Sequence, residues 1–237
     1  MKRIILGAAC LLSAIGANAS DFFSTDECSD LFTFGARIGV NTSNRTMSNS
    51  AVPGAYHHES WGTGFDLGVT LDLNIRDYLS IQPGFFFESR SGAYTVIGTE
   101  IEEGSLINIS EIAQAGKRSS YNFTIPVVAS FHFNITDDLR WNVDAGPYVA
   151  FVLGSRMKNK RFVVNGNADK PLFSQKASAV DFGIKMGTGL EILRHYYAGV
   201  HYMAGCIDAW KTRKLGSYTK NYGGVTKGWV FTVGYIF

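Results

Sequence analysis

The 237-residue sequence predicts an all-β protein, an eight-stranded antiparallel transmembrane β-barrel with short periplasmic turns and long external loops. Three observations predict this fold. Eight segments alternate between apolar and polar residues, the connections between them are alternately short and long, and the final segment is aromatic on one face up to the last residue. A barrel strand that crosses a bilayer has one face in lipid and one in the lumen, so its sequence alternates with a period of two.

The first nineteen residues have the pattern of an export signal. A short basic start precedes a mostly apolar segment, 4–15, and Ala17 and Ala19 form an A-x-A cleavage site that leaves Ser20 as the first mature residue. The apolar segment is too short for a membrane-spanning helix, which needs about 20 apolar residues. We therefore expect a cleaved signal peptide over 1–19, a periplasmic N-terminal tail over 20–30 and the barrel over 31–237.

The alternation can be followed segment by segment. In chain order, apolar residues mainly hold the even positions in 31–41, the odd ones in 61–75, 79–90, 121–134 and 139–154, the even ones in 180–192 and 196–206, and the odd ones in 230–237. These lengths suit the roughly 9–11 residues that a tilted strand needs to cross a bilayer. An even number of strands closes the sheet and leaves no unpaired edge in lipid.

The connections set the topology. Those at 76–78, 136–138 and 193–195 are short, whereas those at 42–60, 91–120, 155–179 and 207–224 are long and polar. Bacterial barrels have short periplasmic turns and longer external loops, so both chain ends are expected on the periplasmic side. The long connection at 91–120 has enough β-branched and aromatic residues to continue as a hairpin above the membrane.

The last strand ends in an aromatic face. Trp229, Phe231, Tyr235 and Phe237 share one parity, as expected for a strand whose aromatic residues lie at the membrane interface. Such terminal aromatic strands resemble the signal that the outer-membrane barrel-assembly machinery reads. We therefore expect that machinery to be a partner during biogenesis.

Charge and composition narrow the function classes. Removal of Lys2 and Arg3 with the signal takes the formal charge from +2 to 0, so no basic excess indicates nucleic acid. A soluble sandwich or lipocalin-like barrel would also alternate. The export signal, the terminal phenylalanine and the loop pattern favour the membrane fold. Cys28 and Cys206 are expected on opposite sides of the membrane and hence not to form a disulfide.

Six stretches of the sequence carry a resemblance to known proteins: 34–44, 68–87, 121–128, 144–151, 181–192 and 199–205. Together they resemble a known family, the PorT-like or "porin family" outer-membrane β-barrel proteins of Bacteroidota-type bacteria. The resemblance implies an integral protein of the outer membrane, and some members of the family work within a secretion assembly. It does not establish transport, because a fold does not fix a function.

The lumen is the first candidate site. An eight-stranded barrel has an interior just wide enough for side chains to fill, and charges there need partners. The preferred interpretation is a salt-bridged polar network that fills the lumen, and the alternative is a narrow porin-like channel for small solutes or ions. Ten charged residues have inward parity: Arg37, Asp66, Asp72, Glu88, Arg90, Arg140, Asp144, Asp181, Lys185 and Glu191.

Enzymatic chemistry has a weaker signal. The run from His57 to Ser60, at the edge of the first external loop, has the residue types of a base, an orienting carboxylate and a nucleophile. Adjacent residues rarely face one another, so we expect no catalytic residues and keep a lipid-modifying enzyme only as a distant alternative. The sequence has no metal-ligand spacing and no cofactor motif, so no metal or cofactor is expected.

The external loops are the last candidate. Basic side chains with interleaved aromatic residues suit contact with the phosphates of lipopolysaccharide, or with a surface or secretion-complex partner. The sequence thus indicates an outer-membrane protein with a structural or surface-interaction role. The basic loop residues are Arg156, Lys158, Lys160, Arg161, Lys211, Arg213 and Lys214.

Overall fold

A computed structural model describes residues 22–25, 27–28, 30–47, 56–101, 109–163, 166–168, 174–213 and 224–237. The signal peptide, with Ala17, Ala19 and Ser20, lies outside these residues and stays a prediction. Among the described residues, no helix is long and apolar enough to span a membrane.

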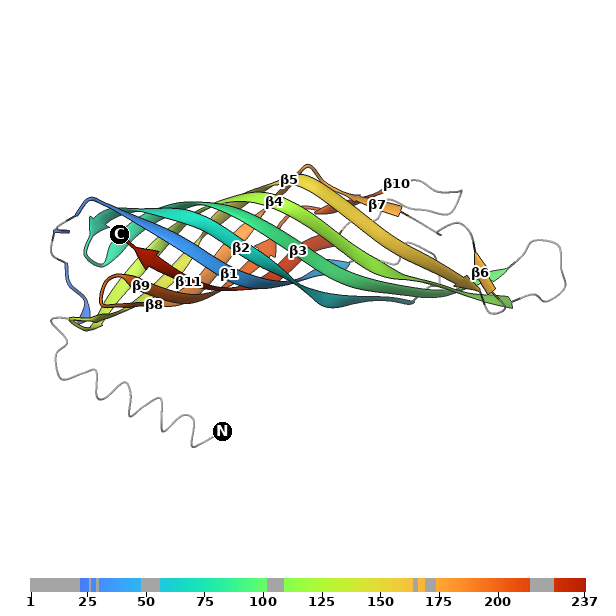
Figure 1. The fold of residues 1–237 in the computed structure, drawn as a ribbon, viewed down its shortest axis with the longest axis horizontal. Coiled ribbons are helices and arrows are strands. Elements are labelled where there is room, and N and C mark those ends of the chain that lie inside the picture. The colour runs from blue at the N-terminus through green and yellow to red at the C-terminus, as the bar shows by residue number, and fades with distance from the viewer. Residues whose placement is uncertain are drawn as a thin grey trace, which may run out of the picture.

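Eight long strands form a closed antiparallel ring, as the sequence predicts (Figure 1). The ring runs β4-β3-β2-β1-β11-β9-β8-β5, and pairing between β4 and β5 closes it. The short strands are β6 (Gly166–Ala168), β7 (Ser174–Ala177) and β10 (Trp210–Arg213). The long strands are β1 (Phe32–Met47), β2 (Tyr56–Arg76), β3 (Leu79–Ile101), β4 (Ile109–Thr136), β5 (Leu139–Val163), β8 (Val180–Ile192), β9 (Tyr196–Gly205) and β11 (Gly224–Ile236).

The alternation places apolar side chains outside and polar ones inside. On β1, Phe34 and Val40 are 60% and 61% exposed, whereas Arg37 and Asn41 are each 5% exposed. In water such exposed apolar faces would be unfavourable, and in a bilayer they are the lipid contact. The terminal residues Trp229, Phe231, Tyr235 and Phe237 lie exposed on this outer face, as predicted.

The turns agree with the predicted short connections. Two-residue turns follow Arg76 and Thr136, and a three-residue turn, 193–195, joins β8 to β9. At this end of the barrel the Cys28 thiol donates a hydrogen bond to the carbonyl of Asn74, at 3.1 Å. Cys206 follows the end of β9 at the opposite mouth.

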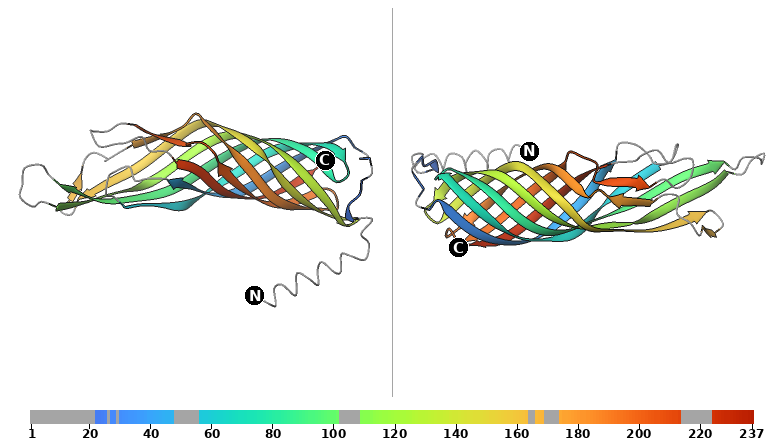
Figure 2. Two further views of the ribbon diagram at one scale, coloured as in Figure 1. Left: turned by 180° about the vertical axis from the view of Figure 1, so that it is seen from behind. Right: turned by 90° about the horizontal axis from the view of Figure 1, so that it is seen from above.

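Four strands run much further than a bilayer requires. β2, β3, β4 and β5 have 21, 23, 28 and 25 residues, compared with 13 in β8 and 10 in β9. Figures 1 and 2 show β3, β4 and β5 continuing beyond the ends of the other strands. We call this extension the external wall, formed by 56–61 of β2, 92–101 of β3, 109–120 of β4 and 155–163 of β5.

The wall confirms one expectation and corrects another. The predicted hairpin above the membrane is present, because β3 and β4 pair as far as Ile101 and Ile109. The first and third long connections are also partly strand, with β1 continuing to Met47 and β5 to Val163. Their polar composition indicated loops, but pairing with neighbouring strands extends each ladder. β7 and β10 pair with each other as a separate two-stranded strap.

Glycine makes close strand packing possible at one inward position. A Cβ on Gly68 would lie 2.3 Å from the Phe85 carbonyl oxygen and 2.4 Å from the Phe86 ring. Neither neighbour can move freely, because the first is backbone and the second is a buried side chain. A Cβ on Gly154 would meet nothing within 4 Å.

Gly68→Ala is therefore expected to lower the free energy of unfolding by about 1–3 kcal/mol, the usual cost of overpacking. Gly154→Ala, the matched control, is expected to change it by less than about 0.5 kcal/mol. Urea unfolding of the refolded mature chain in detergent micelles, followed by heat-modifiable gel mobility, measures both. Equal stability of the two variants would contradict the packing.

Candidate functional site

The predicted charged residues lie in the lumen. All ten have side chains on the inner face, nine of them buried and Arg140 half-buried. They come from β1, β2, β3, β5 and β8 and form stacked clusters along the barrel axis.

The cluster nearest the external mouth is centred on Arg90. Its Nε donates to Glu88 at 2.7 Å and its Nη1 donates to Asp181 at 2.8 Å. The Tyr148 hydroxyl donates to the same Asp181 oxygen at 3.2 Å. We call Arg90, Glu88 and Asp181 the Arg90 clamp. It joins β3 to β8 across the lumen, and each charge is held by an opposite one.

Asp66 and Lys185 continue the network inward from the clamp. Asp66 lies opposite Glu88 in the β2–β3 ladder, and both carboxylates are buried. Asp66 interacts electrostatically with Lys185 and Arg90. The Lys185 ammonium lies 4.8 Å from the centre of the Phe86 ring. Two negative and two positive groups thus meet in this layer.

Asp144 is the centre of the middle cluster. It accepts hydrogen bonds from the Ser130 hydroxyl at 2.5 Å, from His201 Nε2 at 2.8 Å and from the Tyr197 hydroxyl at 3.4 Å. The Arg37 guanidinium lies 3.7 Å from the centre of the Tyr197 ring. This ion–aromatic contact places a positive charge beside the buried carboxylate.

The periplasmic cluster is centred on Arg140. Its guanidinium lies 3.0 Å from Asp77 and 3.5 Å from Glu191. Glu191 also accepts a 2.5 Å hydrogen bond from Asn142, whose side-chain oxygen is 2.9 Å from His132 Nδ1. Asp72, nearby, accepts a hydrogen bond from Gln82. Of the charges in this cluster, the sequence predicted Asp72, Arg140 and Glu191 but not Asp77 of the periplasmic turn, and it did not predict the amides that connect them.

Three inward aromatic residues were not predicted. Phe86, Tyr148 and Tyr197 are buried, each at 3% exposure or less. The signal that would have found them is parity, because each occupies an inward position opposite or beside an inward glycine. A Cβ would meet the Phe86 ring at Gly68 and Gly84, the Tyr148 ring at Gly183, and the Tyr197 ring at Gly189 and Gly199.

The cavities in the lumen differ in volume along the barrel axis. A periplasmic cavity of about 400 Å³ is lined by Asp72, Asp77, Glu191 and Arg140, among others. A pocket of about 50 Å³ lies at the external mouth. Between them, a cavity of about 10 Å³ is lined by Thr70, Phe86 and Lys185, among others. One water needs roughly 10–15 Å³ by this measure, so this central cavity has room for about one water.

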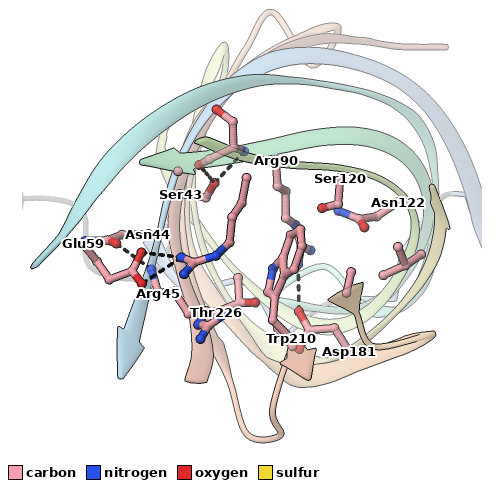
Figure 3. A pocket seen from close by; sticks show the side chains of 16 residues that line it. Ser43, Asn44, Arg45, Glu59, Arg90, Ser120, Asn122, Asp181, Trp210 and Thr226 are labelled. Carbon is pink, nitrogen blue, oxygen red and sulfur yellow. Dashed lines mark hydrogen bonds and ion pairs between the residues drawn. The ribbon is translucent and has the colours of Figure 1, made fainter. Parts of the chain in front are cut away.

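The strap covers the external mouth. Figure 3 shows the indole of Trp210, from β10, in the pocket with Arg90 and Asp181. Trp210 is 9% exposed and pairs with Ala177 of β7. Arg45 of β1 donates a hydrogen bond to Gln175 of β7 at 3.2 Å, which connects the strap to the barrel wall.

The inner face of the external wall has its own polar cluster. Arg118 donates to both Glu59 oxygens, at 2.8 and 2.7 Å, and lies 4.3 Å from the centre of the Tyr94 ring. Gln114 donates to the Tyr94 hydroxyl at 3.0 Å. Both contacts come from Nη1, and this charge-assisted pair beside an aromatic ring connects β2 to β4 here.

This cluster accounts for the run from His57 to Ser60. Glu59 faces the interior and pairs with Arg118, whereas His58 is exposed on the other face of β2. The His57 side chain lies outside the described residues. Because successive strand residues face opposite ways, His58 and Glu59 do not form a base and orienter pair. Among the described residues, no group of three or more acidic, histidine or cysteine side chains is placed to hold a metal ion.

The predicted basic loop residues divide into two groups. Arg156, Lys158 and Lys160 lie exposed on β5 of the external wall. The side chains of Arg161, Lys211 and Arg213 are not described, and Lys214 lies outside the described residues.

Comparison with known proteins adds a family and a set of similar structures. A model of the family described as "Outer membrane protein beta-barrel domain" matches residues 23–209. No curated protein sequence matches the chain.

Three solved structures are among those to which the chain is similar. Ail from Yersinia pestis, in complex with the heparin analogue sucrose octasulfate, has 15% identity and a TM-score of 0.37, covering 86% of this chain and 99% of that one. OprG from Pseudomonas aeruginosa has 11% identity and a TM-score of 0.46, covering 90% and 98%. The outer membrane protease OmpT from Escherichia coli has 11% identity and a TM-score of 0.43, covering 90% and 99%.

The Arg90 clamp generates a stability prediction. Arg90→Met leaves two buried carboxylates without their positive partner, which is expected to lower the free energy of unfolding by about 3–5 kcal/mol. The triple variant Glu88→Gln, Arg90→Met, Asp181→Asn removes all three charges and is expected to recover most of that loss. Urea unfolding in micelles measures both. A triple variant that is less stable than Arg90→Met would show that the clamp does not act as one unit.

Proposed function

Because the chain belongs to the outer membrane protein β-barrel domain family, and is therefore a protein of the outer membrane, we propose that it is a closed, non-conducting barrel. Its role in this proposal is structural or interaction-based: the barrel holds the external wall at the cell surface. The observation that carries the proposal is the central cavity, whose volume is about 10 Å³. A permeating ion needs a continuous path of water or of side-chain ligands, and this space holds about one water.

The charges of the lumen support the same function. Arg90, Arg140 and Asp144 each bind partners of the barrel itself, at distances between 2.5 and 3.5 Å. A buried charge without its partner costs several kcal/mol, so these groups favour one another over a solute in transit. In this proposal the network fixes the strands rather than lining a path.

A narrow channel for small solutes or ions is the second candidate. The two mouths favour it, because the periplasmic cavity of about 400 Å³ and the external pocket of about 50 Å³ are both lined by charged residues. For a solute to pass, the central side chains would have to move so that the periplasmic cavity and the external pocket join. An enzyme is not proposed, since Glu59 is bound to Arg118 and lies away from His58.

The PorT-like resemblance of the sequence extends the proposal to partners. In that reading the external wall contacts a surface or secretion-complex partner. Its support is the wall itself, which continues strands of 21 to 28 residues above a barrel that needs about half that length.

Single-channel recording of the refolded mature chain in a planar bilayer tests the closed lumen. The wild type is expected to give no discrete conductance steps, because side chains fill the centre. A variant with Phe86, Tyr148 and Tyr197 changed to alanine is expected to conduct, since it removes the three aromatic rings. Heat-modifiable gel mobility confirms folding of each sample. Reproducible steps from the folded wild type would contradict the proposal and favour the channel.

A further inference from the structure

A β-bulge lies on β5 where the barrel becomes the external wall. Asn122 of β4 pairs with Val152, and the next residue outward, Tyr121, pairs with Gly154. Leu153 is therefore unpaired. One extra residue on a strand reverses the side-chain alternation beyond it, and bulges are known to redirect side chains in this way.

The bulge decides which face carries the positive charges. Below it, odd residues of β5 such as Phe151 face the lipid, and Phe151 is 43% exposed. Above it, the even residues Arg156, Lys158 and Lys160 are exposed, while Met157 packs inward against Tyr94 and Val96. Without the bulge the odd residues would continue outward, and the three basic side chains would face the interior of the wall.

β4 adds a fourth positive charge to the same face. Lys117 is exposed and lies directly opposite Lys158 in the ladder. Arg156 lies opposite Ser119, and Lys160 opposite Ala115, so the neighbours on this face are neutral. We call Lys117, Arg156, Lys158 and Lys160 the basic ladder.

The basic ladder is unfavourable by itself. Like charges directly opposite on two strands destabilise the pair. None of its four residues forms an ion pair with any other residue in the described ranges. The arrangement therefore gains stability when an anion that the chain does not supply lies against this face.

The position of the ladder identifies that anion. It is continuous with the lipid-facing surface, where Tyr121 and Leu153 are 50% and 65% exposed just below it. Arg156 follows Leu153 by three residues, which on a strand tilted by about 45° is a rise of roughly 7 Å. Groups at this height border the top of the hydrocarbon layer, where the phosphates of outer-leaflet lipids lie.

We propose that the basic ladder binds phosphate groups of outer-leaflet lipid, such as those on lipid A of lipopolysaccharide. Arginine forms paired hydrogen bonds with phosphate and lysine supplies point charges, so the four residues match several phosphate oxygens along one side of the wall. A soluble polyanion is less suited, because the ladder stands on the face that is in lipid just below. The inference does not depend on whether the lumen conducts.

The double variant Lys117→Gln, Lys158→Gln tests the proposal, because its effect on thermal stability is expected to reverse when lipid A is added. In neutral dodecyl maltoside micelles the double variant is expected to melt roughly 1–3 °C above the wild type, because the like-charge pair is removed. With diphosphoryl lipid A in the micelles, the wild type is expected to gain stability and the variant much less. Lipid A affinity is expected to fall roughly tenfold or more.

The matched control is Arg76→Gln with Arg194→Gln. This variant also removes two positive charges, but from residues that line the periplasmic cavity. It is expected to bind lipid A as the wild type does. Dephosphorylated lipid A and dextran sulfate serve as further probes. Unchanged lipid A affinity of the Lys117 and Lys158 variant would overturn the proposal. Equal, lysine-dependent binding of dextran sulfate would also overturn it, in favour of a soluble polyanion.

Discussion

Ring closure is the constraint on which the rest of this structure depends. A bilayer offers no water to backbone groups, so every strand edge within it must be paired. The first and last strands meet this need, because β1 pairs with β11 from Gly35 opposite Ile236 to Met47 opposite Gly224. Closure separates the two faces of the sheet: one is in lipid, and the other encloses a space that lipid never reaches. The charged inner face and the apolar outer face both follow from it.

Eight strands leave little room inside, and that limit shapes the lumen. Large rings such as Tyr148 fit only because glycines such as Gly183 stand opposite them. The buried charges of the Arg90 clamp are held by opposite ones. The same side chains that fill the space also connect distant strands, since Arg90 on β3 binds Asp181 on β8. In the proposed function, a closed lumen and a firmly connected barrel both result from this packing, and the external wall is the part that would meet partners.

Much of this architecture could be predicted from the sequence, because period-two alternation reports directly which face a residue takes. The inward position of Asp66 or Lys185 needs only parity. Three features could not be predicted, since they depend on pairing between distant residues. Polar composition at 155–163 indicated a loop, yet β4 supplies the partner that makes it a strand. One unpaired residue, Leu153, leaves no mark in composition but reverses the face of every residue after it on β5. Glu59 faces inward, where Arg118, 59 positions away, binds it.

The depth at which the lumen closes can be measured directly by cysteine accessibility. In a background with Cys28 and Cys206 changed to serine, single cysteines replace Thr33 in the periplasmic cavity, Thr70 in the central one and Thr226 in the external pocket. A small charged thiol reagent is applied to the refolded protein in liposomes. The closed lumen predicts modification at 33 and 226 and none at 70. Modification at 70 at a rate comparable to the other two positions would contradict it, because the reagent would then have passed through the packed centre.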